Sequence, residues 1–421
     1  MTRMAKWIIA LVFCIGVMQG QTITVLHAFT GTDGANPAAG LLRDPSGNLY
    51  GSTGWGGAYG WGTIFKVDTN NVETVLYSFT GGADGSYPTG LLLDKAGNLY
   101  GTESGCDGYG YCPGTVFKVD ATGKQTILYA FTGGRDGNGP EAGLVRDNSG
   151  NLYGTTSYGG DVGRCTKGSM MSFARPPILF PPNGCGVIFK LSPGGKETVL
   201  YRFTGGPDGG DGAYPAARLV RDSVGNLYGT TVYGGDLIYS PCEQSEYFGC
   251  GTVFKLSWSG KWKENRLYTF EGSTNGDGEF PTTALARDAN GNLYGVAAGG
   301  AYDLGMVFKL NTNGDRAILH NFTGSGGDGA SPLAALIADV SGNLYGTTSA
   351  GGVYGYGTAF KMDTTGSETV LYSFTGGTDG ARPEAALIRE SNGNLYGTTL
   401  LGGDLNCNPP YGCGTVFEIA P

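Results

Sequence analysis

The stretch Asp-Lys-Ala-Gly-Asn-Leu-Tyr-Gly-Thr at residues 94–102 contains a pentapeptide, Gly-Asn-Leu-Tyr-Gly, that recurs along the whole chain. Its seven copies start at Gly47, Gly97, Gly150, Gly225, Gly291, Gly342 and Gly393. Neighbouring copies are 50, 53, 75, 66, 51 and 51 residues apart, so the third and fourth intervals carry insertions. Because a fixed period marks a repeat architecture, the 421 residues need not divide into several unrelated domains.

Each repeat contains four short runs with the composition of β-strands. In the second repeat these runs are Glu73–Phe79, Gly90–Leu93, Asn98–Thr102 and Gly114–Val119, and turn residues separate them. No segment after residue 20 has a sustained helical period. Four short strands in each of seven repeats predict an all-β protein, a seven-bladed β-propeller with four antiparallel strands per blade.

The order of the strands predicts how the ring closes. In propellers the Asp-x-x-Gly-Asn hairpin usually joins the innermost strand to the second one, which makes the Val-Leu-Tyr-Ser-Phe type of run the outermost. The chain then begins with an outermost strand, Thr22–Thr30, and ends with a third strand, Gly414–Ile419. We therefore expect the N-terminal strand to complete the last blade, because a closed ring removes exposed sheet edges.

Charge and the N-terminal segment limit the class of partner and the compartment. The chain has 36 acidic and 27 basic residues, a net charge of −9 and no basic run, so nucleic acid is not an expected partner. Residues 1–20 resemble a signal peptide, with Arg3 and Lys6 before the apolar stretch Trp7–Met18. We expect residues 21–421 to form one monomeric propeller domain outside the cytoplasm, whether secreted, periplasmic or on the cell surface, without a transmembrane segment.

The motifs of the repeat resemble a known family. Phe-Thr-Gly-Gly-x-Asp-Gly, Asp-x-x-Gly-Asn-Leu-Tyr-Gly-Thr-Thr and Gly-Thr-Val-Phe-Lys follow one another as in the GloVer-type tandem repeat of exported bacterial proteins. The resemblance covers essentially the whole chain after residue 20, and it implies export and a propeller-like array but no activity. The Asp-x-x-Gly-Asn-Leu-Tyr part also resembles NHL-type and lactonase-type propellers.

Eight cysteines, besides Cys14 in the N-terminal segment, form local pairs, each between a second and a third strand. The pairs are Cys106 with Cys112, Cys165 with Cys185, Cys242 with Cys250, and Cys407 with Cys413. Their even number, their local pairing and the export signal predict four disulfides. The alternative is metal binding, but two thiols and no histidine in each loop fall short of a four-ligand zinc site.

We interpret the two histidines and the repeated Asp-Gly aspartates as structural. His27 and His320 occupy the slot that holds Tyr77 in the second repeat, so a histidine base for catalysis is not expected. One carboxylate per loop is too few for calcium, which takes about 6–8 oxygen ligands, so we expect no metal and no cofactor, with structural calcium as the alternative. The aspartates in question are Asp33, Asp84, Asp136, Asp211, Asp277, Asp328 and Asp379.

Other charged residues recur near the hairpins and the inner strands. Five repeats have an arginine directly before the hairpin acid: Arg43, Arg146, Arg221, Arg287 and Arg389. These arginines could form a cationic ring at one end of the channel, but we favour a structural role, either pairing with acids between blades or extension of the side chain past apolar neighbours. Glu141 and Glu384 follow the loop proline in two non-adjacent repeats and are channel candidates for paired carboxylates.

Loops that depart from the repeat are the better candidates for a binding site, because the repeat itself already accounts for the fold. The longest departures are residues 161–183 and 237–248. Propeller topology gathers these loops and the Asp-Gly loops on one face, and loops on a rigid scaffold commonly bind ligands. The candidate binding-face residues are Tyr109, Tyr111, Arg164, Phe173, Arg175, Phe180, Tyr239, Glu243, Glu246 and Tyr247.

We therefore expect an exported binding or scaffold propeller that recognises a polysaccharide, a cell-surface component or a protein on its loop-rich, disulfide-pinned face. The first alternative is an extracytoplasmic enzyme, a carbohydrate lyase or hydrolase or a quinone-dependent dehydrogenase, with its site at the central channel. The repeat places recurring rather than distinctive polar residues there, which favours binding over catalysis. The second alternative is a purely structural surface protein.

Overall fold

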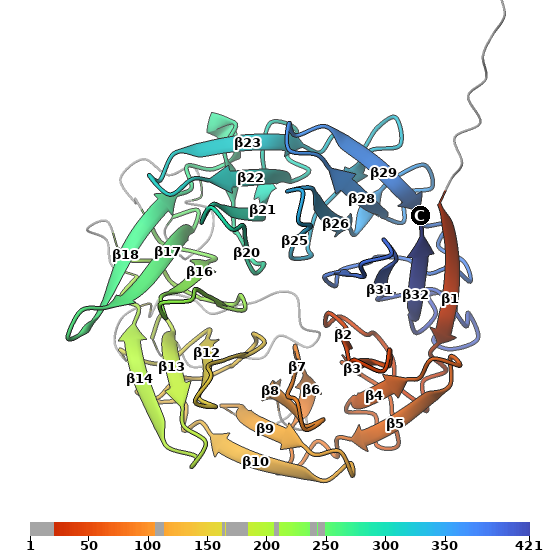
Figure 1. Ribbon diagram of the computed structural model, residues 1–421, viewed down its shortest axis with the longest axis horizontal. Helices are drawn as coiled ribbons and strands as arrows, with labels where there is room; N and C mark the ends of the chain where they lie inside the picture. The colour runs from red at the N-terminus through yellow and green to blue at the C-terminus, as the bar shows by residue number, and fades with distance from the viewer. Residues whose placement is uncertain are drawn as a thin grey trace, which may run out of the picture.

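The computed structural model describes residues 21–105, 113–161, 165, 184–205, 210–235, 242 and 249–421. Within these ranges the chain forms seven antiparallel sheets of four or five strands, which stand around a central axis like the blades of a propeller (Figure 1). The predicted all-β, seven-bladed fold is therefore confirmed.

Each blade contains four strands, named here from the innermost to the outermost. Blades 1 to 3 consist of β2 (Leu42–Arg43), β3 (Leu49–Thr53), β4 (Thr63–Val67) and β5 (Glu73–Ser78); β7 (Leu92–Leu93), β8 (Leu99–Gly105), β9 (Thr115–Val119) and β10 (Gln125–Ala130); and β11 (Val145–Arg146), β12 (Leu152–Thr156), β13 (Val187–Leu191) and β14 (Glu197–Arg202). Blades 4 to 6 consist of β15 (Val220–Arg221), β16 (Leu227–Thr231), β17 (Thr252–Trp258) and β18 (Trp262–Thr269); β20 (Ala286–Arg287), β21 (Leu293–Gly299), β22 (Met306–Leu310) and β23 (Arg316–Asn321); and β25 (Ile337–Ala338), β26 (Leu344–Thr348), β28 (Thr358–Met362) and β29 (Glu368–Ser373). The loops carry the short elements β6 (Ser86–Pro88), β19 (Gly278–Glu279), β24 (Gly329–Ala330), β27 (Ala350–Gly351) and the 3-10 turn η2 (Ser273–Asn275).

Blade 7 joins the two ends of the described chain. Its three inner strands are β30 (Ile388–Arg389), β31 (Leu395–Thr399) and β32 (Thr415–Ala420), and β1 (Thr22–Ala28) is its outermost strand. β1 pairs antiparallel with β32, from Thr22 opposite Ala420 to Ala28 opposite Thr415. The expected closure by the N-terminal strand is confirmed, and it gives the third strand of blade 7 an outer partner.

Buried phenylalanines hold consecutive blades together. The phenylalanine that follows each outer strand packs edge-to-face on the phenylalanine in the third strand of the next blade, with ring centroids 5.0 to 5.4 Å apart. Phe29 and Phe65 make this contact across the seam between blades 7 and 1. The last glycine of the pentapeptide packs against the same phenylalanines, which leave no room for a side chain. A Cβ at Gly51 would lie 2.5 Å from Cζ of Phe65.

The five repeated arginines also bridge neighbouring blades. Each guanidinium lies over the second-strand tyrosine of the preceding blade, 5.2 to 5.9 Å from the ring centroid. Arg43 in addition pairs with Glu390 across the closing seam. Ala338 stands in the arginine slot of blade 6, and a cavity of about 460 Å³ lies there, next to Tyr294 of blade 5. These contacts support the interpretation that the arginines serve packing between blades.

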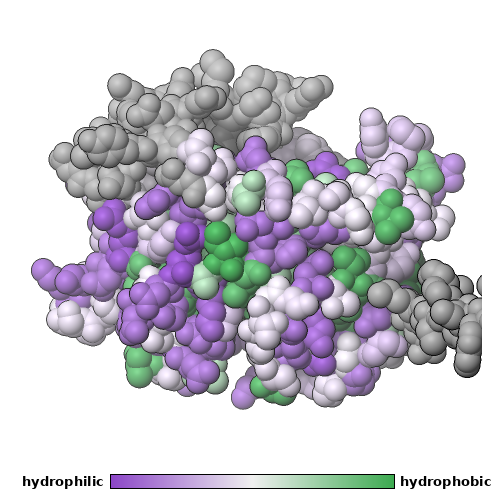
Figure 2. Space-filling model, turned by 90° about the horizontal axis from the view of Figure 1, so that it is seen from above, coloured by the Kyte–Doolittle hydropathy of each residue, from purple (hydrophilic) through white to green (hydrophobic). Residues whose placement is uncertain are grey.

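The surface of the ring does not gather its apolar residues in one place on the side shown in Figure 2. Hydrophobic side chains form several small patches there, with hydrophilic residues between them. Among the described residues, no helical segment combines the length and the hydropathy of a membrane span.

Candidate functional site

One face of the propeller carries two sets of loops. The Asp-Gly loop before each blade lies against the loop between that blade's second and third strands, as the antiparallel bridges Ala35–Trp55, Asn138–Tyr158, Ala213–Tyr233 and Ala381–Leu401 show. We call this side the loop face. Its existence was expected from propeller topology, and it is the face on which the sequence departs most from the repeat.

A ring of left-handed residues connects the blades beneath this face. The residue before the loop proline has a φ between 51° and 66° in all seven repeats: Asn36, Tyr87, Gly139, Tyr214, Phe280, Ser331 and Arg382. Its backbone N–H donates to a carbonyl at the end of the preceding blade's second-to-third loop, over 2.7 to 3.1 Å. A residue other than glycine costs about 1–3 kcal/mol in this conformation, which the bond between blades helps to offset. The ring therefore holds different side chains at equivalent, fixed positions.

Three aromatic side chains of blades 1 and 2 form a contiguous group, which we call the aromatic platform. Tyr87 of the left-handed ring packs edge-to-face on Trp55 and Trp61, with ring centroids 4.6 and 5.7 Å away. The two indole rings stack with centroids 6.5 Å apart. Trp55 is 50% exposed, so the platform presents an aromatic surface to solvent. These residues were not predicted from the sequence, because they belong to different repeats and only the packing of the blades brings them together.

Most of the exposed aromatic side chains among the described residues lie on the loop face. Within the described residues seven are exposed, and six of them lie in second-to-third loops: Trp55, Tyr59, Tyr302, Tyr354, Tyr356 and Tyr411. The seventh, Trp258, is at the hairpin between β17 and β18. Aromatic residues on loops of a rigid scaffold are typical of a binding surface, because they supply large contact areas at low entropic cost.

A buried glutamate lies in β8, the second strand of blade 2. Glu103 is 1% exposed and occupies the slot that holds threonine in five other repeats. Its Oε2 accepts hydrogen bonds from the backbone N–H groups of Ser86 and Gly105, over 3.3 and 3.1 Å. Burial raises the pKa of Glu103 to about 7, although these bonds favour the carboxylate. The sequence shows that glutamate replaces the usual threonine at this position, but it does not show that the glutamate side chain is buried.

The channel candidate Glu141 lies in a network of aromatic hydroxyl groups. Its Oε2 accepts hydrogen bonds from Ser157 Oγ at 2.8 Å and from Tyr214 Oη at 3.0 Å. Tyr214 packs edge-to-face on Tyr158 and Tyr233, with centroids 5.0 and 5.9 Å away. Burial raises the pKa of Glu141, and the two hydroxyl bonds oppose that effect. A carboxyl group in this state suits hydrogen bonding to a polar ligand or proton transfer.

The other channel candidate, Glu384, is held by a cation. Arg382 Nε and Nη2 donate to its Oε1 over 3.0 and 2.7 Å. Glu141 and Glu384 thus belong to separate hydrogen-bond networks. Their role as paired carboxylates at the channel stays a prediction.

Disulfides pin the loop face at three blades. Cys165–Cys185, Cys242–Cys250 and Cys407–Cys413 are bonded, each with Cα atoms 5.5 or 5.6 Å apart. The second cysteine of each pair supplies the carbonyl that accepts the left-handed residue's N–H of the next blade. These bonds therefore anchor long loops at the junctions between blades, and three of the four predicted disulfides are confirmed.

The fourth predicted disulfide falls in the loop between β8 and β9. Both of its cysteines, Cys106 and Cys112, lie outside the described residues. The bond between Cys106 and Cys112 therefore stays a prediction.

The candidate binding-face residues from the sequence also lie outside the described residues, so their role stays a prediction. They are Tyr109, Tyr111, Arg164, Phe173, Arg175, Phe180, Tyr239, Glu243, Glu246 and Tyr247. Tyr109-Gly-Tyr111 repeats, in sequence, the Tyr-Gly-aromatic pattern of residues 59–61 and 354–356. The described loops with this pattern carry the exposed residues Tyr59, Tyr354 and Tyr356.

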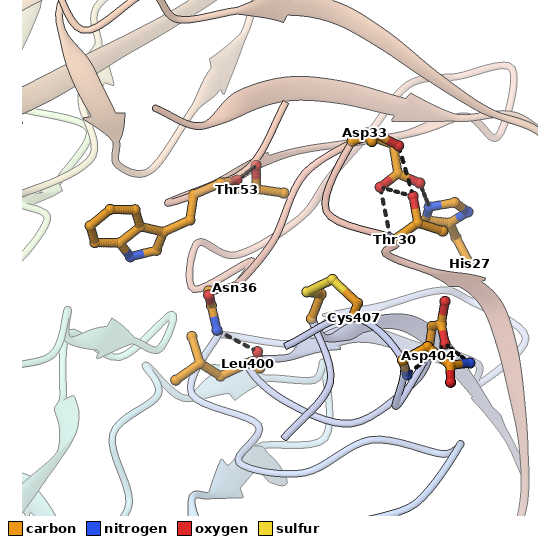
Figure 3. The surroundings of a disulfide bond; sticks show 12 residues. His27, Thr30, Asp33, Asn36, Thr53, Leu400, Asp404 and Cys407 are labelled. Carbon is orange, nitrogen blue, oxygen red and sulfur yellow. Dashed lines mark hydrogen bonds and ion pairs between the residues drawn. A yellow bond between two sulfur atoms is a disulfide. The ribbon is translucent and has the colours of Figure 1, made fainter. Parts of the chain in front are cut away.

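The Asp-Gly aspartates make the turn contacts expected of them. Asp84 accepts hydrogen bonds from Thr80 N–H and from Tyr77 Oη, at 2.9 and 2.8 Å. Burial disfavours its charged form, but the hydrogen bonds from Thr80 and Tyr77 outweigh burial and lower the pKa of Asp84. In the first repeat His27 replaces the tyrosine, and its Nε2 lies 3.0 Å from Asp33 Oδ2 (Figure 3).

Fold and site together define a closed seven-bladed propeller with a disulfide-pinned, aromatic loop face. The family comparison gives a match to the Gloeobacter/Verrucomicrobia repeat over residues 11–171 and 182–417, and the chain belongs to this family. No curated protein matches the sequence.

Solved structures resemble this chain at low sequence identity. The extracellular domain of a one component system protein from B. thetaiotaomicron is 10% identical with a TM-score of 0.54, and the match covers 94% of this chain and 40% of that one. A gluconolactonase from Xanthomonas campestris is 10% identical with a TM-score of 0.45, covering 94% and 89% of the two chains. At 10% identity, the likeness to the extracellular domain concerns the fold alone.

Proposed function

We propose that this protein is an extracytoplasmic binding propeller and that its loop face holds a polysaccharide. The observation that carries the proposal is the concentration of exposed aromatic side chains on this face. One of them is Trp55, which forms the aromatic platform together with the half-buried Trp61 and Tyr87. Flat aromatic rings stack on the apolar faces of sugars, and nearby polar groups bond the hydroxyls.

The polar groups needed for sugar hydroxyls are close to the loop prolines. Arg382 and Glu384 form a charged pair in blade 7, and Glu141 with Tyr214 offers a carboxyl and a phenol at the junction of blades 3 and 4. Because both sets are built on the rigid left-handed ring, a ligand would meet preorganised donors and acceptors.

The extracytoplasmic location is supported by the disulfides and by the signal-like segment at residues 1–20. Structural disulfides persist in oxidising compartments. We propose that residues 21–421 act there as a single monomeric propeller.

The test is binding to a panel of soluble plant and bacterial polysaccharides, measured by the shift of the thermal midpoint and then by calorimetry. Trp55→Ala removes an exposed ring of the platform, and Trp258→Ala removes a comparably exposed tryptophan away from the loop face. A tryptophan at a binding hot spot contributes about 2 kcal/mol or more, so Trp55→Ala should weaken binding about 30-fold or more. Equal affinities of the two variants, or no shift of the thermal midpoint with any polysaccharide, would contradict the proposal.

A second candidate function is cleavage of the bound polysaccharide, and Glu141 is the residue that favours it. A carboxyl with a raised pKa beside the phenol of Tyr214 is suited to general acid catalysis. Release of reducing ends or unsaturated products by the wild type, and their loss in Glu141→Gln with binding retained, would identify an enzyme.

A further inference from the structure

A three-residue cluster recurs on the outer wall, where consecutive outer strands meet. It consists of an aromatic side chain near the end of one outer strand, the Asp-Gly aspartate that follows, and the first residue of the next outer strand. In blades 2 and 3 the cluster is Tyr129, Asp136 and Glu197, and Tyr129 Oη donates to Asp136 Oδ2 over 3.0 Å.

At two junctions histidine replaces the tyrosine, and the cluster then contains only metal-ligating groups. His27, Asp33 and Glu73 bring their ligand atoms within 4.8 Å of one another at the seam between blades 7 and 1. The same arrangement occurs between blades 5 and 6, where it consists of His320, Asp328 and Glu368. A third group within the described residues, Cys242, Cys250 and Glu279, has its thiols consumed by a disulfide.

The first cluster contains a carboxylate oxygen that makes no hydrogen bond within the described residues and could bind a ligand. Asp33 Oδ1 accepts from Thr30 N and Oγ1, which leaves Oδ2 toward His27 Nε2 (Figure 3). Glu73 Oε1 is buried and has no hydrogen-bond partner among the described residues, and the same holds for Glu368 Oε1 in the second cluster. A buried carboxylate oxygen without a partner is costly, and a cation removes that cost.

We propose that these two clusters are binding sites for divalent transition-metal ions of the Zn²⁺ type. One imidazole nitrogen and two carboxylate oxygens form a ligand set that zinc accepts, with water in the fourth position. Bonds of about 2.0–2.2 Å place the ligand atoms of a tetrahedral ion about 3.4 Å apart. His27 Nε2 and Asp33 Oδ2 are already 3.0 Å apart, so it is mainly the carboxylate of Glu73 that must adjust its position. His27 and Asp33 are 17% and 18% exposed, so an ion can enter from solvent.

The first site would reinforce the closure of the ring. His27 belongs to β1, the N-terminal strand of blade 7, and Glu73 begins β5 of blade 1. An ion shared by them would link the closing strand to the next blade, on the outside of the Phe29–Phe65 contact. The ion would then stabilise the folded chain by its binding free energy.

The experiment uses the full mature chain after treatment with a chelator, titrated with Co²⁺ as a spectroscopic probe and with Zn²⁺ in calorimetry. The wild type should take up two ions, His27→Tyr and His320→Tyr one each, and the double variant none. Tyrosine is the natural occupant of this slot in five blades, so these variants should fold. Failure of the wild type to bind at micromolar ion concentrations, or two ions in the double variant, would overturn the proposal.

A gain of binding tests the ligand set itself. Tyr129→His adds the missing imidazole to Asp136 and Glu197, and it should create a third site. Tyr77→His is the matched control. In its cluster Gln125 occupies the position of the glutamate, so Asp84 supplies the one carboxylate of the three residues. A third ion in the Tyr129→His variant alone supports the assignment. The same stoichiometry in both variants would show that these three side chains are not the ligand set.

Discussion

Replacement of Glu103 by threonine should make the protein more stable above neutral pH. The carboxyl group has an ordinary pKa of 4.5, and burial raises it to about 7 in the folded protein. Because one pKa unit corresponds to about 1.4 kcal/mol, this rise amounts to about 3 kcal/mol between the two protonation states. Four equivalent threonines instead bond a threonine of the third strand over 2.8 Å, so the variant side chain should bond Thr115 in the same way.

The direction of the pH dependence follows from proton binding. Between pH 4.5 and about 7 the folded protein holds a proton on Glu103 that the unfolded chain releases, so the free energy of unfolding falls as the pH rises through this window. The wild type therefore loses about 3 kcal/mol of stability between pH 4.5 and pH 8 from this group, and Glu103→Thr does not.

Denaturant unfolding of wild type, Glu103→Thr and Glu103→Gln at pH 4.5 and pH 8 measures this difference. Glu103→Gln keeps the shape of the side chain and removes its titration, so it separates charge from packing. Both variants should gain stability relative to the wild type on going from the lower to the higher pH. The same difference between variant and wild type at the two pH values would mean that Glu103 is ionised in the folded protein without cost.

Three further substitutions test the packing of the blades by denaturant unfolding. Ala338→Arg should fill the cavity at the junction of blades 5 and 6 and restore the stacking on tyrosine found at five other junctions, with a gain of about 0.5–1 kcal/mol; a loss would show that the cavity is too small. Changing Cys407 and Cys413 to serine should cost about 2 kcal/mol through loop entropy, and no change would mean that other contacts hold this loop. Gly51→Ala forces a Cβ against Phe65 and should cost about 1–3 kcal/mol; a neutral result would contradict the close approach.

The fold is predictable from the sequence because the same strand and turn motifs recur in every blade. One pentapeptide marks the second strand of all seven blades, and the position of Thr22–Thr30 before the first complete repeat predicts the closure that β1 and β32 form. Pairing within one loop likewise predicts the disulfides Cys165–Cys185 and Cys407–Cys413, because the two cysteines of each loop can meet without any knowledge of how the blades pack.

The site is less predictable because it arises between repeats. Trp55 and Tyr87 contact each other only through the packing of blade 1 on blade 2, and the left-handed backbone that turns Tyr87 toward the tryptophans depends on a hydrogen bond to Trp61 of the neighbouring blade. The histidines were interpreted as variants of a structural tyrosine, and that holds for their contact with the aspartate. Their approach to Glu73 and Glu368 is a property of the ring that no single repeat displays.

The claim that the loop face is the binding surface can be tested with the tryptophans as reporters. Of the five in the chain, Trp55 and Trp61 lie in the platform, and Trp258 and Trp262 lie at the β17–β18 hairpin. Fluorine NMR of the protein labelled with 5-fluorotryptophan, during titration with the polysaccharide selected from the panel, resolves the two pairs. We expect saturable shifts for Trp55 and Trp61 and unchanged signals for Trp258 and Trp262. Shifts confined to Trp258 and Trp262 would show that the polysaccharide binds away from the loop face.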